Sequence, residues 1–370
     1  MKENWKECKL GEVCYFAKDK VSVSELNNDI YISTENMMPN RGGITKATNL
    51  PTGEQTPSFE SGDILVSNIR PYFKKIWKAT FSGGCSADVL NFKSRNNISN
   101  DFLYYILSDD EFFKYCMTTS KGTKMPRGDK VAIMQYPINL PPLATQQKIA
   151  TILSSLDDKI ELNNKINDNL EQQAQAIFKN WFVDFKPFGG KMPDGWKVGK
   201  LSDLITVKYG KDHKKLNDGN YPVYGSGGIM RYVEKFLYDK ESVLIPRKGT
   251  LNNVFYINEP FWSVDTMFYT EMKKENIAKY VYFFVKGKDL NSMNAGSAVP
   301  SMTTEILNAI EVVIPSDEYL EKFENIVSPM FKQIKQCIIE NENLASIRDT
   351  LLPKLMNGEI ETNSNIISKR

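Results

Sequence analysis

The chain has 370 residues, which is enough for two or three domains. Its composition, 41% hydrophobic and 25% charged, is that of a globular protein. Its densest apolar run, residues 280–285, is much shorter than the roughly 20 residues that cross a bilayer, and the N-terminus lacks the apolar stretch of a signal peptide. We therefore expect a cytoplasmic protein without a membrane partner.

The net charge is only +2, but it is unevenly distributed. Acidic residues gather in two long polar stretches, 144–186 and 317–361, so the rest of the chain carries a basic surplus that is compatible with nucleic-acid contact. Five cysteines without a CxxC pair and a single histidine, His213, argue against a structural metal site.

Residues 1–142 mix short strand-like runs, glycine turns and isolated helical stretches. Apolar runs at 63–69 and 136–140 are typical of strands, and the aromatic-rich run at 101–107 is typical of a helix. The double proline at 141–142 then ends this region. The mixture predicts an α/β or α+β globule.

Residues 143–186 are predicted to form a long helix. Side chains spaced alternately by four and three residues form a heptad seam. The seam includes Leu156, Ile160, Asn163, Asn167 and Leu170. The serine pair at 154–155 is predicted to end a short first helix, about 144–153, before the long one begins.

Residues 187–316 repeat the first region. "WKECKLGEV" from Trp5 returns as "WKVGKLSDL" from Trp196, and "KGTKMP" from Lys121 aligns with "AGSAVP" from Ala295, after which the offset holds at 174 residues. Strand-like runs follow in the same order, at 242–246, 253–257 and 310–315. The chain is therefore predicted to be two copies of one module.

Residues 317–361 form the second predicted helical region, with a seam in the same register as the first. Its members include Met330, Ile334, Asn341, Leu344 and Leu351. Matching registers favour two long antiparallel helices that pair as a coiled coil, although each helix packing only on its own globule stays an alternative. The pair Ser328-Pro329 aligns with the serines at 154–155 and is predicted to begin the long helix.

The expected organisation is thus pseudo-two-fold, with two similar globular domains separated by a helical spacer. The predicted boundaries are 1–142 for the first domain, 143–186 for the central helical region, 187–316 for the second domain, 317–361 for the C-terminal helical region and 362–370 for a tail.

A search for catalytic residues leaves one arrangement. Asp265, Glu271 and Lys273 imitate the acidic pair and lysine of metal-dependent nucleases. The aligned stretch after Asp88 lacks the glutamate and the lysine, and strands often carry such residues on a solvated face. We predict no catalytic residue and no metal, and keep a nuclease as the less favoured alternative.

Several motifs resemble the specificity subunit of a type I restriction-modification enzyme. They are "LPPLATQQKI" (140–149) at the start of the first helical region, "LLPKLMNGEI" (351–360) at the end of the second, and "PDGWKVGKLSDL" (193–204), which is similar to the opening of that family's target recognition domains. The resemblance covers nearly the whole chain. The second helical region departs from it, because "IPSDEYLEKF" (314–323) lacks the double proline and the glutamines, which puts equal partner contacts in doubt.

The resemblance implies two target recognition domains that each read half of a split, asymmetric site on double-stranded DNA. The helices would set the half-site spacing and dock two modification subunits. Those methyltransferase subunits would bind S-adenosylmethionine, and restriction subunits would add ATP-driven translocation and Mg²⁺-dependent cleavage, so no cofactor is expected in this chain. A two-module coiled-coil scaffold that does not bind DNA remains the alternative from another class.

Basic clusters supply the candidate DNA contacts, since lysine and arginine anchor phosphates and contact base edges. The candidates are Arg70, Lys74, Lys75, Lys121, Lys124, Arg127, Lys211, His213, Lys214, Lys215, Arg231, Arg247 and Lys248. For each of them an ordinary solvated charge is at least as good an interpretation. The glycine-flanked loop "SKGTKMPRGDK" (120–130) is the strongest candidate, because a flexible basic loop can approach a backbone closely.

Overall fold

The computed structural model describes residues 4–122, 124–295 and 300–360. The chain divides into two compact units, one built from the residues up to Leu162 together with those from Glu340 onward, the other from Asn163–Ile339. Two helices of 40 residues each, α5 (Leu143–Phe182) and α9 (Asp317–Met356), give one half to each unit. Among the helices of the described ranges, none has the length and the apolar character that crossing a membrane requires.

The first unit contains short strands and helices ahead of α5. Its strands are β1 (Lys6–Lys9), β2 (Cys14–Phe16), β3 (Lys20–Ser22), β4 (Tyr31–Ile32), β5 (Gln55–Phe59), β6 (Ile64–Ser67), β7 (Ile76–Lys78), β8 (Gly83–Cys85), β9 (Val89–Ser94) and β10 (Pro137–Leu140). Its helices are α1 (Leu10–Val13), α2 (Asn100–Ser108), α3 (Asp110–Thr118) and α4 (Lys130–Ile133), with 3₁₀ turns η1 (Val23–Glu25) and η2 (Pro71–Phe73).

The second unit has a similar order of elements between α5 and α9. Its strands are β11 (Lys197–Lys200), β12 (Ile205–Tyr209), β13 (Asp218–Gly225), β14 (Gly228–Val233), β15 (Ser242–Pro246), β16 (Phe255–Ile257), β17 (Trp262–Ser263), β18 (Met267–Met272) and β19 (Glu311–Ile314). Its helices are α6 (Leu201–Leu204), α7 (Ala278–Lys286) and α8 (Thr304–Ala309), with the 3₁₀ turn η3 (Lys186–Phe188).

The predicted internal repeat is confirmed by the strand order. A four-stranded sheet β2-β9-β6-β7 in the first unit corresponds to β12-β18-β15-β16 in the second, and the antiparallel pair β1-β10 corresponds to β11-β19. A parallel pair also recurs, β4 with β8 and β13 with β17. Apolar and β-branched runs form the central strands, since β6 and β15 are buried along their whole lengths.

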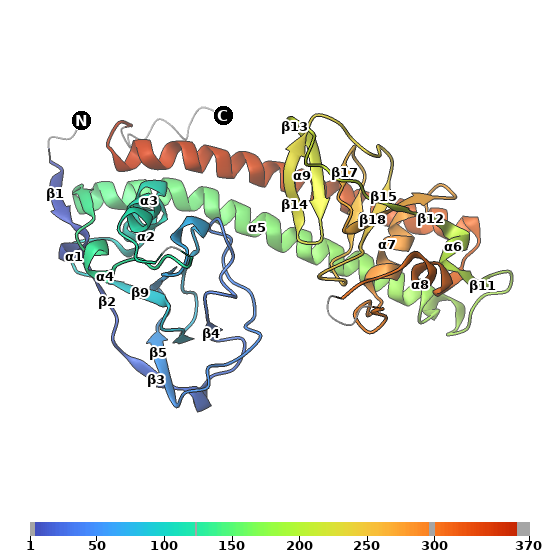
Figure 1. Ribbon diagram of the computed structural model, residues 1–370, viewed down its shortest axis with the longest axis horizontal. Helices are drawn as coiled ribbons and strands as arrows, with labels where there is room; N and C mark the ends of the chain where they lie inside the picture. Colours follow the sequence, from blue (N-terminus) through green and yellow to red (C-terminus); the bar gives the residue numbers. More distant parts are fainter. Residues whose placement is uncertain (1–3, 123, 296–299, 361–370) are drawn as a thin grey trace. The chain divides into compact units, whose positions relative to one another are not determined.

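The strands added to this framework differ between the units. In the first unit β3 and β5 extend the parallel pair to the sheet β3-β5-β8-β4, which lies on the side of that unit away from α5 (Figure 1). In the second unit the long β13 pairs with β14 as a hairpin and gives the sheet β14-β13-β17. The two units therefore share a frame and present different sheets on it.

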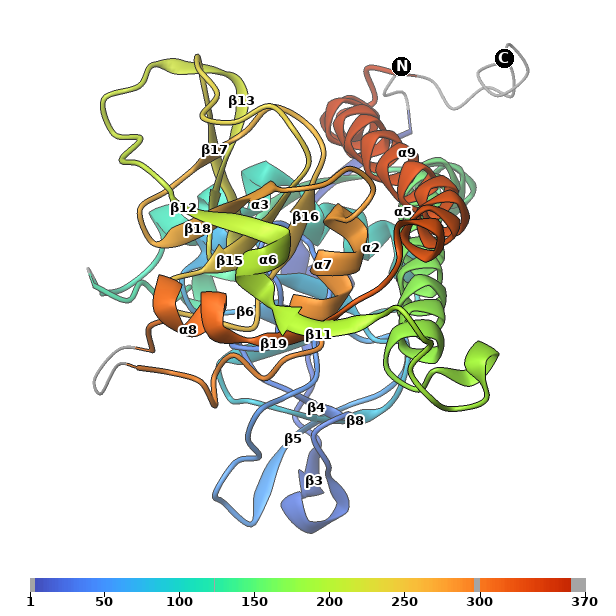
Figure 2. The ribbon, with the colours of Figure 1, turned by 90° about the vertical axis from the view of Figure 1, so that its right-hand side faces the viewer.

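In the second unit, α7 packs against the paired long helices α5 and α9. In the second unit, Figure 2 shows α7 between the sheet β12-β18-β15-β16 and the helices α5 and α9. Phe178 of α5 contacts Tyr280 and Phe283 of α7 and Phe323 of α9, with ring centroids 5.4, 5.9 and 6.2 Å away. Such aromatic packing contributes burial and favourable edge-to-face geometry together.

The long helices pair antiparallel within each unit. In the first unit, Ile149 and Leu153 of α5 share a core with Leu352 and Leu355 near the end of α9. In the second, the later half of α5 meets the first half of α9, as the contact of Trp181 with the Tyr319 ring shows. All seam residues named from the sequence are buried or partly buried.

The predicted helix breaks are wrong. Both α5 and α9 are continuous through residues 154–155 and 328–329. Ser154 and Ser155 return their hydroxyls to the carbonyls of Thr151 and Ile152, which satisfies them without ending the helix. Buried side chains on both sides of Pro329, such as Val327 and Cys337, hold the second helix together despite the missing N–H.

Candidate nucleic-acid interface

The described part of the basic loop, residues 120–122 and 124–130, docks on the end of β6. Ile69 and Arg127 form an antiparallel bridge, and the backbone N–H of Arg70 donates to the Pro126 carbonyl at 2.8 Å. The Gly128 N–H donates to the carbonyl of Asn68 at 3.2 Å. A side chain at Gly128 would meet the Asn68 Oδ1 at 2.8 Å, so glycine permits this close approach. The loop is thus built into the framework.

Ion pairs stabilise the same loop. Lys121 pairs with Asp129 at 2.6 Å, and Arg127 pairs with Asp88 at 3.1 Å. The Lys121 hydrogen bond, followed by the N–H groups of Ala132 and Val131 at the start of α4, lowers the pKa of Asp129. Both cations remain largely exposed, so their N–H groups can also donate hydrogen bonds to a phosphate.

The other basic candidates of the first unit differ in their surroundings. Lys74 pairs with Asp110 at 2.8 Å, and Lys75 donates to the Thr34 carbonyl at 2.6 Å while burial lowers its pKa. These two lysines serve intramolecular contacts. Lys124 is exposed, and Arg70 is half-buried.

In the second unit, the end of β15 repeats the docking arrangement. Lys248 bridges to Ser301, and the Gly249 N–H donates to the Pro300 carbonyl at 3.2 Å. Arg247 donates to the Asp265 carbonyl at 3.1 Å and lies over the Tyr209 ring at 5.3 Å. Lys248 itself is exposed.

The remaining basic candidates of the second unit lie around β13 and β14. Lys211, Lys214 and Lys215 are exposed and His213 is half-buried, in the segment between β12 and β13. This segment is anchored because the Trp262 indole donates to the Lys211 carbonyl at 2.9 Å.

Arg231 of β14 is largely engaged within the protein. Its guanidinium pairs with Asp218 at 2.7 Å and donates to the Leu216 carbonyl at 3.0 Å. Sequence reasoning missed the neighbouring exposed apolar residues of β14, Ile229 and Met230, because the glycines around them are typical of a turn and say nothing of exposed apolar side chains. Exposed apolar side chains on a hairpin suit contact with a partner surface.

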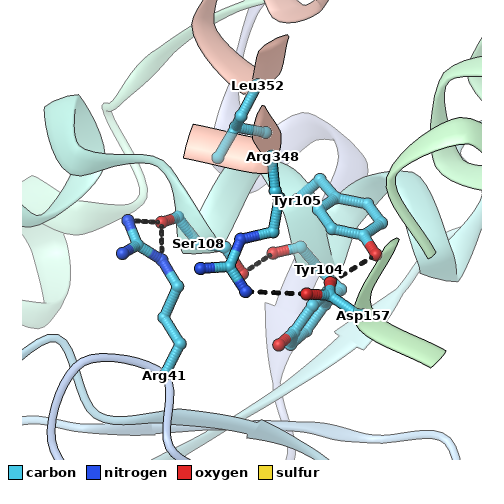
Figure 3. A pocket seen from close by; sticks show the side chains of 7 residues that line it. All are labelled: Arg41, Tyr104, Tyr105, Ser108, Asp157, Arg348 and Leu352. Carbon is cyan, nitrogen blue, oxygen red and sulfur yellow. Dashed lines mark hydrogen bonds and ion pairs between the residues drawn. The ribbon is translucent and has the colours of Figure 1, made fainter. Parts of the chain in front are cut away.

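A cluster of polar side chains lies among α2, α5 and α9 of the first unit (Figure 3). Asp157 of α5 accepts hydrogen bonds from the Tyr105 hydroxyl at 2.8 Å and from Arg348 of α9 at 2.7 Å. Burial, with the Asp157 charge in addition, raises the pKa of Tyr104 to about 12. Asp157 thus ties Tyr105 of α2 and Arg348 of α9 to α5, which gives the cluster a structural role.

Two of the three side chains named for a nuclease, Glu271 and Lys273, are engaged with other residues. The Lys273 ammonium donates to the Ser202 carbonyl at 2.6 Å, and Glu271 pairs with Lys208 at 3.5 Å. In the ranges that the structure covers, no group of three or more histidine, cysteine, aspartate or glutamate side chains is placed to hold a metal ion.

Comparison with known proteins gives consistent matches. A family model described as "Type I restriction modification DNA specificity domain" matches residues 2–172 and 193–348. The HindI specificity subunit of Haemophilus influenzae is 26% identical over 96% of this chain and 100% of its own length. The MjaIX specificity subunit of Methanocaldococcus jannaschii is 26% identical over 73% of this chain and 71% of its own.

The fold is also found in a solved structure. The crystal structure of a type I restriction-modification system S subunit from M. genitalium aligns with a TM-score of 0.55 over 95% of this chain and 96% of that one, at 19% identity. The family model covers both halves and most of the sequence. The chain therefore belongs to the family of type I restriction modification DNA specificity domains.

Proposed function

We propose that this chain is the DNA sequence-specificity subunit of a type I restriction-modification system, in which each unit binds one half of a bipartite, asymmetric DNA target. The duplicated framework carries the proposal. The sheet order and the loop docking recur in both units, whereas the added strands differ. One frame with two different surfaces suits two half-sites of different sequence. The specificity subunits among its relatives support the same function.

The proposal assigns the chemistry to other subunits. Two modification subunits would dock on the paired helices, bind S-adenosylmethionine and methylate a flipped-out adenine, and restriction subunits would use ATP and Mg²⁺. The chain itself would be non-catalytic and act in the cytoplasm. Exposed apolar residues on the helices support a docking role, with Leu162 and Ile347 in the first unit and Ile326 and Ile338 in the second.

A salt titration tests DNA binding directly. The chain, assembled with the modification subunits of its source strain, should lose affinity for its target steeply as salt rises, with a slope of about −0.9 for each phosphate contact in a plot of log affinity against log salt. A non-DNA scaffold would bind no duplex at any salt concentration. A nuclease would cut DNA alone with magnesium, and Glu271→Ala would abolish the cutting.

Single substitutions sharpen the same titration. Lys124→Ala and Lys248→Ala remove exposed cations beside the two docked loops, and we expect each to reduce the slope by about 0.9 if it removes one phosphate contact. Lys75→Ala is the matched control, because this ammonium is bound to the Thr34 carbonyl. Its slope should equal that of the unsubstituted chain.

A further inference from the structure

Arg70 has a backbone conformation that arginine rarely adopts. Its φ is 50° and its ψ is 64°, in the left-handed region, immediately before the turn η2. Lys74 at the other end of this turn also has a positive φ, 51°. Left-handed backbone strains residues that carry a side chain and favours glycine, and such strain gathers at functional positions.

The internal repeat identifies the equivalent residue in the second unit. The Arg70 N–H donates to the Pro126 carbonyl, and the Gly249 N–H donates to the Pro300 carbonyl, two prolines that are 174 residues apart. The preceding residues also form equivalent bridges in the two units. Arg70 and Gly249 therefore occupy the same place in the framework.

Glycine is the residue that this place favours. Gly249 has a φ of +89°, so both units require left-handed backbone here, and only the second meets the requirement with the residue best suited to it. The first unit carries an arginine against its backbone preference. A stabilising contact of the guanidinium within the fold would explain why arginine stands at this position.

In the described part of the chain, the guanidinium makes no polar contact that would give it such a role. Its Nε is buried without a hydrogen-bond partner, and the described residues give its other nitrogens no hydrogen bond or ion pair. Nearby cations behave differently, since Lys74, Lys121 and Arg127 all pair with carboxylates. A half-buried group with five donors and no acceptor is suited to an external ligand.

We propose that Arg70 determines specificity in the first half-site by contacting the edge of a guanine in the major groove; this inference rests on the proposed function. The guanidinium fork matches guanine O6 and N7, the acceptors that arginine most often reads. The left-handed backbone fixes the direction in which the Cα–Cβ bond of Arg70 leaves the chain, and the Nε of the guanidinium is buried. A phosphate contact needs only a cation within reach, which a flexible lysine on unstrained backbone supplies.

The test is the methylation pattern of a host that carries the full chain with its modification subunits. Arg70→Gly should relax recognition at one G·C position of one half-site by about tenfold or more, and leave the other half-site unchanged. The melting temperature should stay the same or rise, because glycine relieves the left-handed strain. Arg70→Asn, which tolerates this backbone, provides a second variant and should give the same motif.

Two further variants separate the alternatives. Lys74→Gly relieves strain and removes a cation at the other end of the same turn, yet should leave the motif unchanged because Asp110 binds that lysine. Arg70→Lys keeps the charge and should still relax the motif, since an ammonium does not form the fork. An unchanged motif in Arg70→Gly, or weaker methylation without relaxed bases, would overturn the assignment. Absence of site-specific methylation by the unsubstituted complex would instead refute the proposed function.

Discussion

Arg348 of α9 donates from Nη1 to Oδ1 of Asp157 of α5 at 2.7 Å within the first unit, with side chains only 14% and 28% exposed. Residues 174 positions away occupy the equivalent places in the second unit. They are Ala174 and Phe331, which belong to an apolar and aromatic core. One unit thus uses an ion pair where its copy uses packing.

Removing one partner of this pair should destabilise the first unit. We expect Arg348→Ala to lower the free energy of unfolding by about 2 kcal/mol, because the partly buried Asp157 carboxylate then loses the positive charge that it pairs with. The double variant Asp157→Phe with Arg348→Ala copies the second unit. Its loss in free energy of unfolding should be smaller than the sum of the losses of Arg348→Ala and Asp157→Phe. Chemical denaturation of all three measures the coupling. Strictly additive losses would contradict it, and Lys322→Ala, which breaks the exposed pair with Glu318, serves as the control.

The first unit should also lose stability in acid through Asp110. Burial opposes its ionisation, but hydrogen bonds from Lys74 and Arg41 outweigh burial and lower its pKa below the usual 3.8. A lowered carboxyl pKa contributes stability above about pH 4 that is lost as the pH falls through the folded-state pKa. Asp110→Asn should be less stable than the unsubstituted chain at pH 7, and the difference should shrink toward pH 2. Denaturation midpoints across this range test the prediction, and a constant difference would contradict it.

Gly83 of β8 is expected to tolerate no side chain. A Cβ there would lie 2.1 Å from the Ile30 carbonyl oxygen, which is backbone and has little freedom to move. Gly83→Ala should destabilise the sheet β3-β5-β8-β4 by about 2 kcal/mol. Gly53→Ala is the matched control, since its nearest atom is 3.7 Å away. Limited proteolysis of the first unit should accelerate for the first variant alone, and equal rates would argue against the clash.

The helices can be tested as a spacer by deleting one heptad. Removing seven residues from each helix, between 156 and 177 in α5 and at the facing positions of α9, keeps the seam in register. The gap between half-sites should shorten, or activity should be lost, while the bases read stay the same. Methylome sequencing measures both, and altered bases in either half-site would count against a spacer role.

Several regular elements could be predicted from the sequence because their signals are local. The runs at 63–69 and 242–246 contain β6 and β15, and the run at 101–107 lies within α2. The heptad seams could be aligned because they repeat at one offset. The helix breaks were predicted wrongly, since serine caps and a proline are local features that packing along the whole helix overrode.

The environment of the basic candidates could not be predicted from the sequence. Whether a lysine is engaged depends on residues distant in the chain, as when Asp110 binds Lys74 across 36 positions. The left-handed backbone of Arg70 has no sequence signal of its own, because arginine does not favour it. The equivalent hydrogen bonds of Arg70 and Gly249 to the docked loops show that the two residues correspond.

The added strands enter the framework at the same place in both copies. In the first unit most of the extra chain lies between β2 and β6, and in the second it lies between β12 and β15. Both insertions begin and end on strands of the shared four-stranded sheet, or next to them. We therefore expect this segment to be exchangeable: a different insertion between the same two strands would leave the frame, the docked loop and the long helices unchanged.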